Sequence, residues 1–566
     1  MTRASRPGLI ALLALGSVVS TAPGIRAQGR GGAEWTTTSG DAQRSSWIRS
    51  DPRISVANMT KGADGFGPFK FLWKLRVDAD PRKPNPLTQP VLLDRIIGFR
   101  GFKSVAFVAT SSGTVYAIDT DFGTELWKVH LNYGASLPPM SVGTAECPAG
   151  VTAALTRPTA LSVSAFGGGG GFAGRGGRSG GGVGEAGRGA PSIYTAGQGR
   201  GGGAAPGLPP TPGAAAPGSA AAAAQAGRAG GPGGGGGGGR GQAPGAPDAA
   251  YAIGNDGYVR ALNVQSGWEM FPPVQFLPAN TRPAGAIVVN DETSGFLYAV
   301  TTHGCAYTPD AVWAVDLINP KKDVVSWDAR GATIAGSAGL AFGRDGTIYV
   351  ATGEGSSPVS NSIVALEPKT LKQKAIFTLA KADFVAAPIV VQHKEKDLVA
   401  VAAKDGRIFV LDGASLQVPL ATTPAAGELT GEGLASWQDE KGIRWIAAAA
   451  TGTVVAYRLA DEGPGLALQK GWTSRALVAP LTPLVVNGVV FALSSGEEES
   501  SGTAARAARS SPAVLYALDS ASGKELWSSG KSITAPARGG LSAGAGVVYV
   551  PTTDSTLYAF GFPIEK

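Results

Sequence analysis

The feature that most constrains this chain is a phrase that it spells twice, in two distant places. "GTVYAIDTDFGTELW" begins at Gly113, and "AVLYALDSASGKELW" begins at Ala513. The core of the phrase is an aromatic or apolar residue, an alanine, an apolar residue and a turn-forming residue. This core occurs eight times, with the following residues in the alanine position: Ala117, Ala261, Ala314, Ala365, Val410, Ala456, Ala517 and Ala559. Such units cannot bury their apolar faces alone, so the copies are expected to stack on one another.

The spacing of the copies matches one four-stranded unit each. Consecutive copies lie 42 to 62 residues apart once the 82 residues from Phe166 to Pro247 are set aside. Within a unit, a run rich in β-branched residues precedes the alanine-bearing strand, as at 348–352 and 547–551. A glycine turn separates these two strands, and a second turn leads to a strand that ends the unit. The sequence therefore predicts an all-β fold, an eight-bladed propeller of four-stranded antiparallel blades.

The two ends of the chain are expected to share one blade. Only seven residues follow Ala559, which is too short for the last strand of the final unit. The missing strand lies near the N-terminus, in "FKFLWKLRV" from Phe69 to Val77. Pairing the N-terminal strand with the C-terminal blade would close the ring and leave no exposed sheet edge. Residues 28–165 and 248–566 would then form a single propeller domain.

The repeated residue types have structural roles in this arrangement. The small alanine lets neighbouring blades approach closely. Asp119 and Asp519 are expected to bond the backbone of the following turn, and Gly123 and Gly523 to take its left-handed conformation. Tryptophans are expected to fill the gaps between adjacent blades, each with its indole N–H bonded. These tryptophans are Trp73, Trp127 and Trp527.

The N-terminus predicts export. Arg3 and Arg6 precede an apolar stretch from Leu9 to Val19, which indicates a signal peptide over residues 1–27 with cleavage after Ala27. No later segment has the apolar length of a membrane span, so no transmembrane anchor is expected. We expect a soluble monomer in the periplasm or outside the cell.

The basic composition does not indicate nucleic-acid binding. The formal net charge is +7, of which the signal segment contributes +3 and residues 166–247 contribute +5, leaving −1 for the rest. Residues 166–247 are rich in Gly, Ala, Pro and Arg, and this low-complexity composition predicts a disordered insertion. The part of the chain that folds is near neutral, so no nucleic-acid partner is expected.

The repeat resembles that of the quinoprotein family of eight-bladed propellers, whose pattern is like A-x-D-x-x-T-G-x-x-x-W. "AIDTDFGTELW" and "ALDSASGKELW" match it closely, and "EWTTTSGDAQRSSWIRSD" looks like the entry segment of bacterial proteins with these repeats. The resemblance covers the mature chain except the insertion. It implies pyrroloquinoline quinone with calcium on the propeller axis, an Asp base, Glu and Asn metal ligands, and a disulfide between adjacent cysteines.

This chain departs from that family pattern. Its two cysteines, Cys147 and Cys305, are not adjacent, and it has no C-x-x-C-H haem motif, so no haem is expected. No catalytic residue and no metal ligand can be assigned by motif. The two cysteines flank neighbouring repeats, and they are expected either to form a disulfide after export or to remain as buried thiols.

One repeat position indicates a binding site. In propellers of this kind, the residues just before each innermost strand line one mouth of the channel. Those residues include Gln89, Arg157, Arg282, Glu432 and Arg538. Three arginines at one mouth favour a small polyanionic ligand, with the quinone first, because the guanidinium fork binds a carboxylate bidentately. The alternative is that each arginine bonds carbonyls of its own blade or faces a water-filled funnel.

Two function classes stay open. One is a quinone-dependent dehydrogenase acting on an alcohol or a sugar, or a degenerate descendant that still binds the cofactor. The other is a non-catalytic scaffold that binds a protein partner at the propeller face, similar to the propeller component of bacterial outer-membrane assembly. The arginine mouth favours the first class. The missing cysteine pair, metal-ligand motif and haem motif favour the second.

Overall fold

The computed structural model describes most of the repeat region. The described residues are 35–62, 67–77, 87–98, 101–131, 147, 150–161, 248–290, 295–319, 323–463, 465–497 and 509–563. The predicted signal peptide, 1–27, and the predicted insertion, 166–247, lie outside them. No helix in these ranges is both long and apolar enough to cross a bilayer.

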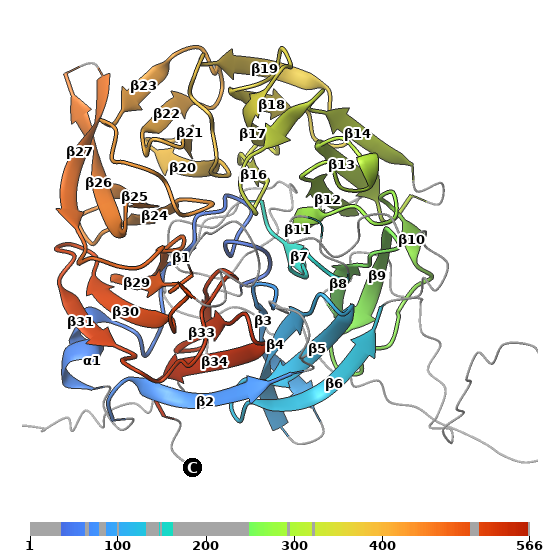
Figure 1. Cartoon of the computed structure of the whole chain (residues 1–566), viewed down its shortest axis with the longest axis vertical. Helices are drawn as coiled ribbons and strands as arrows, with labels where there is room; N and C mark the ends of the chain where they lie inside the picture. Colours follow the sequence, from blue (N-terminus) through green and yellow to red (C-terminus); the bar gives the residue numbers. More distant parts are fainter. Residues whose placement is uncertain are drawn as a thin grey trace, which may run out of the picture.

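The strands form eight sheets arranged as blades around a ring (Figure 1). Blade 1 contains β3 (Val91–Gly98), β4 (Gly101–Ala109), β5 (Thr114–Asp119) and β6 (Thr124–His130). Blade 2 contains β8 (Ala249–Ile253), β9 (Tyr258–Asn263) and β10 (Val274–Gln275). Blade 3 contains β11 (Pro283–Asn290), β12 (Gly295–Thr301), β13 (Ala311–Asp316) and β14 (Val324–Asp328), with η1 (Cys305–Tyr307) between β12 and β13. Blade 4 contains β15 (Ala332–Ile334), β16 (Leu340–Phe342), β17 (Ile348–Gly355), β18 (Ser362–Leu366) and β19 (Gln373–Thr378).

The second half of the chain builds the remaining four blades. Blade 5 contains β20 (Ile389–His393), β21 (Lys396–Ala402), β22 (Ile408–Asp412) and β23 (Pro419–Thr422). Blade 6 contains β24 (Ala435–Gln438), β25 (Arg444–Ala450), β26 (Thr453–Glu462) and β27 (Gly465–Thr473). Blade 7 contains β28 (Leu484–Val486), β29 (Val489–Ser494), β30 (Val514–Asp519) and β31 (Glu525–Ser528), with β1 (Trp47–Ile48) added in parallel to β28. Blade 8 contains β32 (Ser542–Gly544), β33 (Val547–Pro551), β34 (Thr556–Gly561) and β2 (Lys70–Arg76). The short helix α1 (Val56–Lys61) lies between β1 and β2 in the chain.

The eight-bladed propeller predicted from the repeats is confirmed. Each of the eight residues in the alanine position lies in the third strand of a different blade, from Ala117 in β5 to Ala559 in β34. All eight are buried between neighbouring sheets. Their small side chains let the blades pack face to face, as close packing of the interior requires.

Blade 2 departs from the expected four strands. Only three of its strands are regular, and the innermost position is held by Thr156, which bridges to Tyr251. Directly afterwards the chain leaves this blade, because β7 (Pro158–Thr159) pairs in parallel with β11 of blade 3. Proline has no N–H to continue a ladder, so Pro158 suits a point where the pairing changes.

The ring closes through its two ends, as predicted. Strand β2 pairs antiparallel with β34, and Trp73 lies opposite Ala559 in the register. Figure 1 shows the blue β2 running along the red β34 at the rim. The C-terminal blade therefore takes its outermost strand from near the N-terminus, which covers the edge of β34.

The repeated Trp and Gly meet across blade boundaries. The indole N–H of Trp73 in blade 8 donates to the carbonyl oxygen of Thr120 in blade 1, at 2.9 Å. The same indole covers Gly123, where an added Cβ would lie 2.4 Å from the ring. Gly123 also has a φ of +65°, a conformation that glycine adopts without strain.

Two other blade junctions show the same contact between a tryptophan and the turn glycine of the next blade. Trp127 donates to Val264 O at 3.0 Å and covers Gly267, and Trp472 donates to Ser520 O at 2.9 Å. Trp472 covers Gly523 in turn. The tryptophan of one blade and the turn glycine of the next thus form one packing unit.

The remaining repeat residues take up local contacts. Asp119 accepts a hydrogen bond from the Asp121 N–H at 3.0 Å, and Asp519 accepts from the Ala521 N–H at 2.8 Å. Trp527 packs edge-on against Phe69, with ring centroids 4.9 Å apart.

The centre of the ring holds residues 35–48, here called the axial segment. Its backbone and side chains bond the innermost strands of seven blades in chain order. The partners, from blade 1 to blade 7, are Leu92, Arg157, Ala286, Phe342, Val390, Ser436 and Val485. Just beyond the segment, Asp51 accepts from the Gly546 N–H of blade 8 at 2.8 Å. The segment therefore winds once around the inner wall and satisfies backbone groups that the ring would otherwise bury unpaired.

Arg44 is the hub of the axial segment. Its guanidinium donates to Leu340 O at 2.8 Å, Gly285 O at 2.7 Å, and Thr38 O at 2.7 Å. It also donates to Thr37 Oγ1 at 2.8 Å. One side chain thus joins blades 3 and 4 to two residues of the segment itself. Burial lowers the pKa of Arg44 to about 9, and nearby Asp41 opposes that shift.

Candidate functional site

One side of the ring carries all the residues predicted to line the mouth. Strands alternate in direction, so the loops between second and third strands lie on the same side as the loops between blades. We call this side the mouth face. The five predicted mouth residues all lie in the loops between blades or at the start of an innermost strand.

Gln89 holds the axial segment in place. Its Oε1 accepts from the Ser39 N–H at 3.1 Å, and its Nε2 donates to Leu541 O at 2.5 Å. An added Cβ at Gly540 would lie 2.9 Å from Gln89 Nε2, so the loop that carries Arg538 packs against Gln89. The structure therefore brings Gln89 and the loop of Arg538 together, at the junction of blades 8 and 1.

The three predicted arginines differ in their surroundings. Arg157 is buried, and its backbone N–H donates to the carbonyl oxygen of Thr36 in the axial segment at 2.8 Å. Arg282 is half-buried, with its carbonyl accepting from Thr302 N. Arg538 is exposed, and its Nε lies 3.4 Å from the carboxylate of Glu497. Arg538 is thus paired within its own part of the ring, and Arg157 is close to the axial segment.

Glu432 lies at a different part of the mouth. Its side chain is exposed, and its carbonyl accepts from the Ala387 N–H at 3.0 Å. An added Cβ at Gly336 would lie 2.2 Å from the same carbonyl. The backbones of blades 4, 5 and 6 therefore meet here directly, and Glu432 contributes its main chain to that contact.

A pocket of about 430 Å³ opens near this junction, and the sequence patterns did not predict it. Its lining comes from the end of β17, the loops on both sides of blade 5 and the turn between β21 and β22. The charged lining residues are Glu354, Lys381, Asp383, Lys404, Asp405 and Glu428. Four carboxylates and two ammonium groups give this pocket an excess of negative charge.

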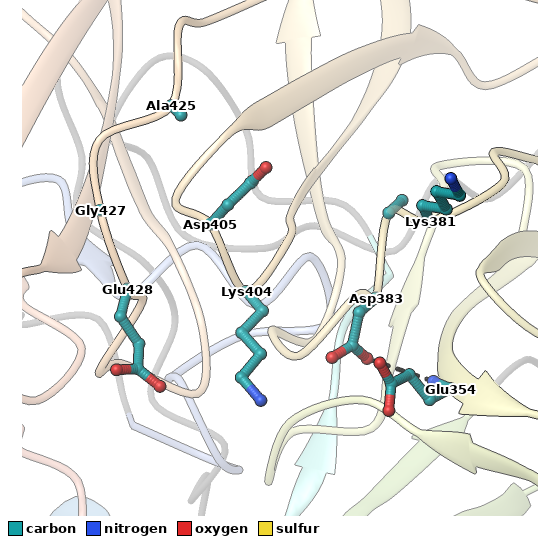
Figure 2. Close-up of a pocket in the computed structure, with 9 residues that line it drawn as sticks. Glu354, Lys381, Asp383, Lys404, Asp405, Ala425, Gly427 and Glu428 are labelled. Carbon is teal, nitrogen blue, oxygen red and sulfur yellow. Dashed lines mark hydrogen bonds between the residues drawn. The ribbon is translucent and has the colours of Figure 1, made fainter.

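Three of those carboxylates face the same space. Figure 2 shows Glu354 and Asp383 directed toward the same region as Glu428, with Lys404 between them in this view. Asp383 accepts from the Glu354 N–H at 3.2 Å, which fixes the two loops to each other. Asp405 points elsewhere and pairs with Arg407 at 2.7 Å. A group with positive charge would find complementary oxygens here.

The sequence held only a weak signal for this pocket. "TGEGSS", which contains Glu354, has the composition of a blade turn and shows no helix signal that would make it a phosphate loop. Asp383 and Glu428 lie in connections that carry no repeat pattern. Their convergence depends on how far each loop rises above its blade, which the repeat does not specify.

A disulfide also lies on the mouth face. Cys147 and Cys305 are bonded, with an S–S distance of 2.01 Å. Cys147 is in the connection that enters blade 2, and Cys305 is in η1 of blade 3. The bond therefore ties the entry of blade 2 to the neighbouring blade.

The family resemblance implies pyrroloquinoline quinone with calcium on the propeller axis. Calcium needs several oxygen ligands together, and within the described ranges no three His, Cys, Asp or Glu side chains are grouped to hold a metal. The carboxylates of a quinone need cations, and of the predicted arginines Arg538 already pairs with Glu497 and Arg157 is buried. The described residues do not fit the metal, and no catalytic step follows from them.

Comparison with known proteins shows the fold. No family model matches the chain, and no curated protein matches it. Quinohemoprotein alcohol dehydrogenase from Comamonas testosteroni is similar with a TM-score of 0.53 at 13% identity, covering 94% of this chain and 81% of that one. A europium-containing methanol dehydrogenase gives 0.52 at 10% identity, covering 94% and 98%. BamB from Moraxella catarrhalis gives 0.44 at 12% identity, covering 88% and 99%, which is too distant to support an argument. The chain therefore has a quinoprotein-like eight-bladed propeller fold.

Proposed function

We propose that this protein is an exported, quinoprotein-like propeller that works as a binding scaffold. We propose further that the pocket over blade 5 takes a basic group of its partner. The observation that carries this proposal is the meeting of Glu354, Asp383 and Glu428 around one pocket on the mouth face. A rigid ring with charged loops on one face suits recognition, because functional residues concentrate on loops held by a stable scaffold.

The test is calorimetric titration with a cationic probe, a tetralysine peptide. We expect the parent to bind it and the double variant Glu354→Gln/Glu428→Gln to bind it about two- to thirtyfold more weakly, since each exposed ion pair contributes roughly 0.2–1 kcal/mol. Asp383 is left intact because its carboxylate bonds the backbone. Glu440→Gln, an exposed carboxylate on the opposite side of the ring, is the matched control and should bind like the parent. Equal binding by the double variant would remove the pocket from the proposal.

Quinone binding is the second candidate function, favoured by Arg282, a half-buried arginine in a loop of the mouth face. The fold is also that of two dehydrogenases whose names indicate quinone or methanol chemistry. We expect any such binding to weaken about tenfold or more on Arg282→Ala, because a charge-assisted contact contributes about 1.5–3 kcal/mol. Titration of the parent with pyrroloquinoline quinone, with and without calcium, distinguishes the two functions. If millimolar quinone produces no heat of binding, the quinone function is rejected and the scaffold function remains.

A further inference from the structure

The outermost strand of blade 8 concentrates positive charge on the outside of the ring. Strand β2 contains Lys70, Lys74 and Arg76, whose side chains are all exposed, and it contains no acidic residue. Within the described ranges none of the three forms an ion pair, and Lys74 only lies over the Tyr558 ring, 5.7 Å from its centroid. The other outermost strands in these ranges carry at most one lysine or arginine each. The three cations of β2 are therefore available to a partner.

Exposed aromatic side chains accompany this charge. Phe71, in β2 itself, is 37% exposed, and Phe122, in the turn between β5 and β6, is 65% exposed. That turn packs directly on β2, because the Trp73 indole donates to Thr120 O at 2.9 Å and covers Gly123. Charge alone would keep edge strands from pairing with one another, and that role needs no aromatic rings beside it. The combination of charge and exposed rings indicates an interaction surface.

The next blade continues the aromatic surface. Trp268, 77% exposed, follows Gly267 in the turn between β9 and β10, and Trp127 of β6 covers Gly267. Because β6 begins directly after the turn that holds Phe122, this one strand connects the two aromatic turns. Figure 1 shows β2 and β6 as neighbours on the outside of the ring. Both turns join third and fourth strands, so they lie on the face opposite the mouth.

The repeat does not require these aromatic side chains. The position of Phe122 is held by Ser522 in blade 7, and that of Trp268 is held by Thr124 in blade 1. Gly523 still docks on a tryptophan with Ser522 beside it, so a polar residue supports the same turn. A ring that stays exposed gains little from burial within the protein. The apolar surface of both rings is therefore left for a partner.

We propose that β2 and the two aromatic turns form a docking surface for a membrane with anionic phospholipid headgroups. We call this surface the rim patch, and it consists of Lys70, Phe71, Lys74, Arg76, Phe122 and Trp268. Aromatic side chains enter the boundary between headgroups and acyl chains, while lysine and arginine are attracted to the phosphates. Charge complementarity selects this occupant, because cations without carboxylate partners repel a second copy of the same patch and attract an anionic surface. The rim patch spans blades 8, 1 and 2, and it is independent of the proposed pocket over blade 5.

Co-sedimentation with vesicles tests this on residues 28–566, the chain expected after signal cleavage. We expect the parent to bind vesicles that contain phosphatidylglycerol more tightly than vesicles of phosphatidylcholine alone, and to bind them less tightly as salt rises. Lys70→Gln/Lys74→Gln/Arg76→Gln should bind the anionic vesicles at least about tenfold more weakly. The reason is that each cation near an anionic surface contributes about fivefold.

A matched control removes the same charge elsewhere on the ring. Lys441→Gln/Lys470→Gln/Lys524→Gln changes three exposed lysines of blades 6 and 7, outside the rim patch. This control has the same net charge as the triple variant at β2, and it should bind anionic vesicles like the parent. The comparison therefore separates the position of the charge from its amount.

A further variant tests the aromatic part and guards against a folding defect. Phe122→Ser/Trp268→Thr places at each position the residue that another blade has there, so its melting temperature should equal that of the parent. It should bind anionic vesicles about tenfold more weakly, because two exposed rings no longer enter the lipid.

Three outcomes of the vesicle assay overturn the proposal. They are a parent that does not sediment with anionic vesicles, a parent that binds both kinds of vesicle equally, and a triple variant at β2 that binds as tightly as its control. A dimer of the parent that Phe122→Ser/Trp268→Thr abolishes, without vesicle binding, would assign the rim patch to a second copy instead. Tetralysine titration of the same variants should match the parent, which separates this result from the test of the pocket.

Discussion

Gly123 shows why the turn residue and the tryptophan belong to one unit. Its φ of +65° is in the left-handed region, and an added Cβ would lie 2.4 Å from the ring of Trp73. We expect Gly123→Ala to lower the free energy of unfolding by roughly 2–4 kcal/mol, from backbone strain and overpacking together. Denaturant titration followed by tryptophan fluorescence measures it.

The matched control for this substitution is Gly530→Ala. Gly530 has a φ of +53°, and nothing lies within 4 Å of an added Cβ, so only the backbone strain of about 1–2 kcal/mol should remain. Equal losses for the two variants would show that the contact with Trp73 contributes nothing.

At the scale of single elements, the axial segment links seven of the eight blades through hydrogen bonds. Arg44 is 1% exposed and bonds carbonyls of blades 3 and 4 as well as its own segment. Arg44→Met would leave those carbonyls buried and unpaired, and we expect a loss of roughly 3–5 kcal/mol in the free energy of unfolding. Thermal unfolding checks this against Arg458→Met on the surface, which should change stability by no more than about 0.5 kcal/mol. A tolerated Arg44→Met would mean that the segment is held mainly by its backbone bonds.

At the scale of the whole molecule, the disulfide is expected to stabilise blade 2, whose innermost position is an isolated bridge and not a regular strand. Cys147 and Cys305 are separated by 158 residues, and the bond joins the entry of blade 2 to blade 3. Because a cross-link restricts the unfolded chain more when the loop is long, we expect Cys147→Ser/Cys305→Ser to cost roughly 2–5 kcal/mol. Guanidinium denaturation of the oxidised parent, the reduced parent and the double variant measures this. Reductant should lower the denaturation midpoint of the parent and leave that of the double variant unchanged. Equal midpoints for the oxidised and the reduced parent would contradict a stabilising role.

Much of the fold could be predicted from the sequence, while little of the candidate site could. The eight positions from Ala117 to Ala559 and the displaced strand around Trp73 were enough for blade number and ring closure, because both follow from a local pattern counted along the chain. Repeat register also predicted that Arg157 and Arg538 lie in the connections before innermost strands, where the structure has them. It did not show that Arg157 is buried beside Thr36, or that Arg538 pairs with Glu497.

The sequence by itself determined the architecture, since each blade needs the same small residue, turn and aromatic closure wherever it lies in the ring. Only the tertiary structure decided what fills the centre and which charges meet. The axial segment carries no repeat, and its path depends on inner strands from all parts of the chain. The pocket carboxylates likewise come from loops that no local period relates. Their positions follow from the closing of the ring, which brings distant loops together only after every blade is in place.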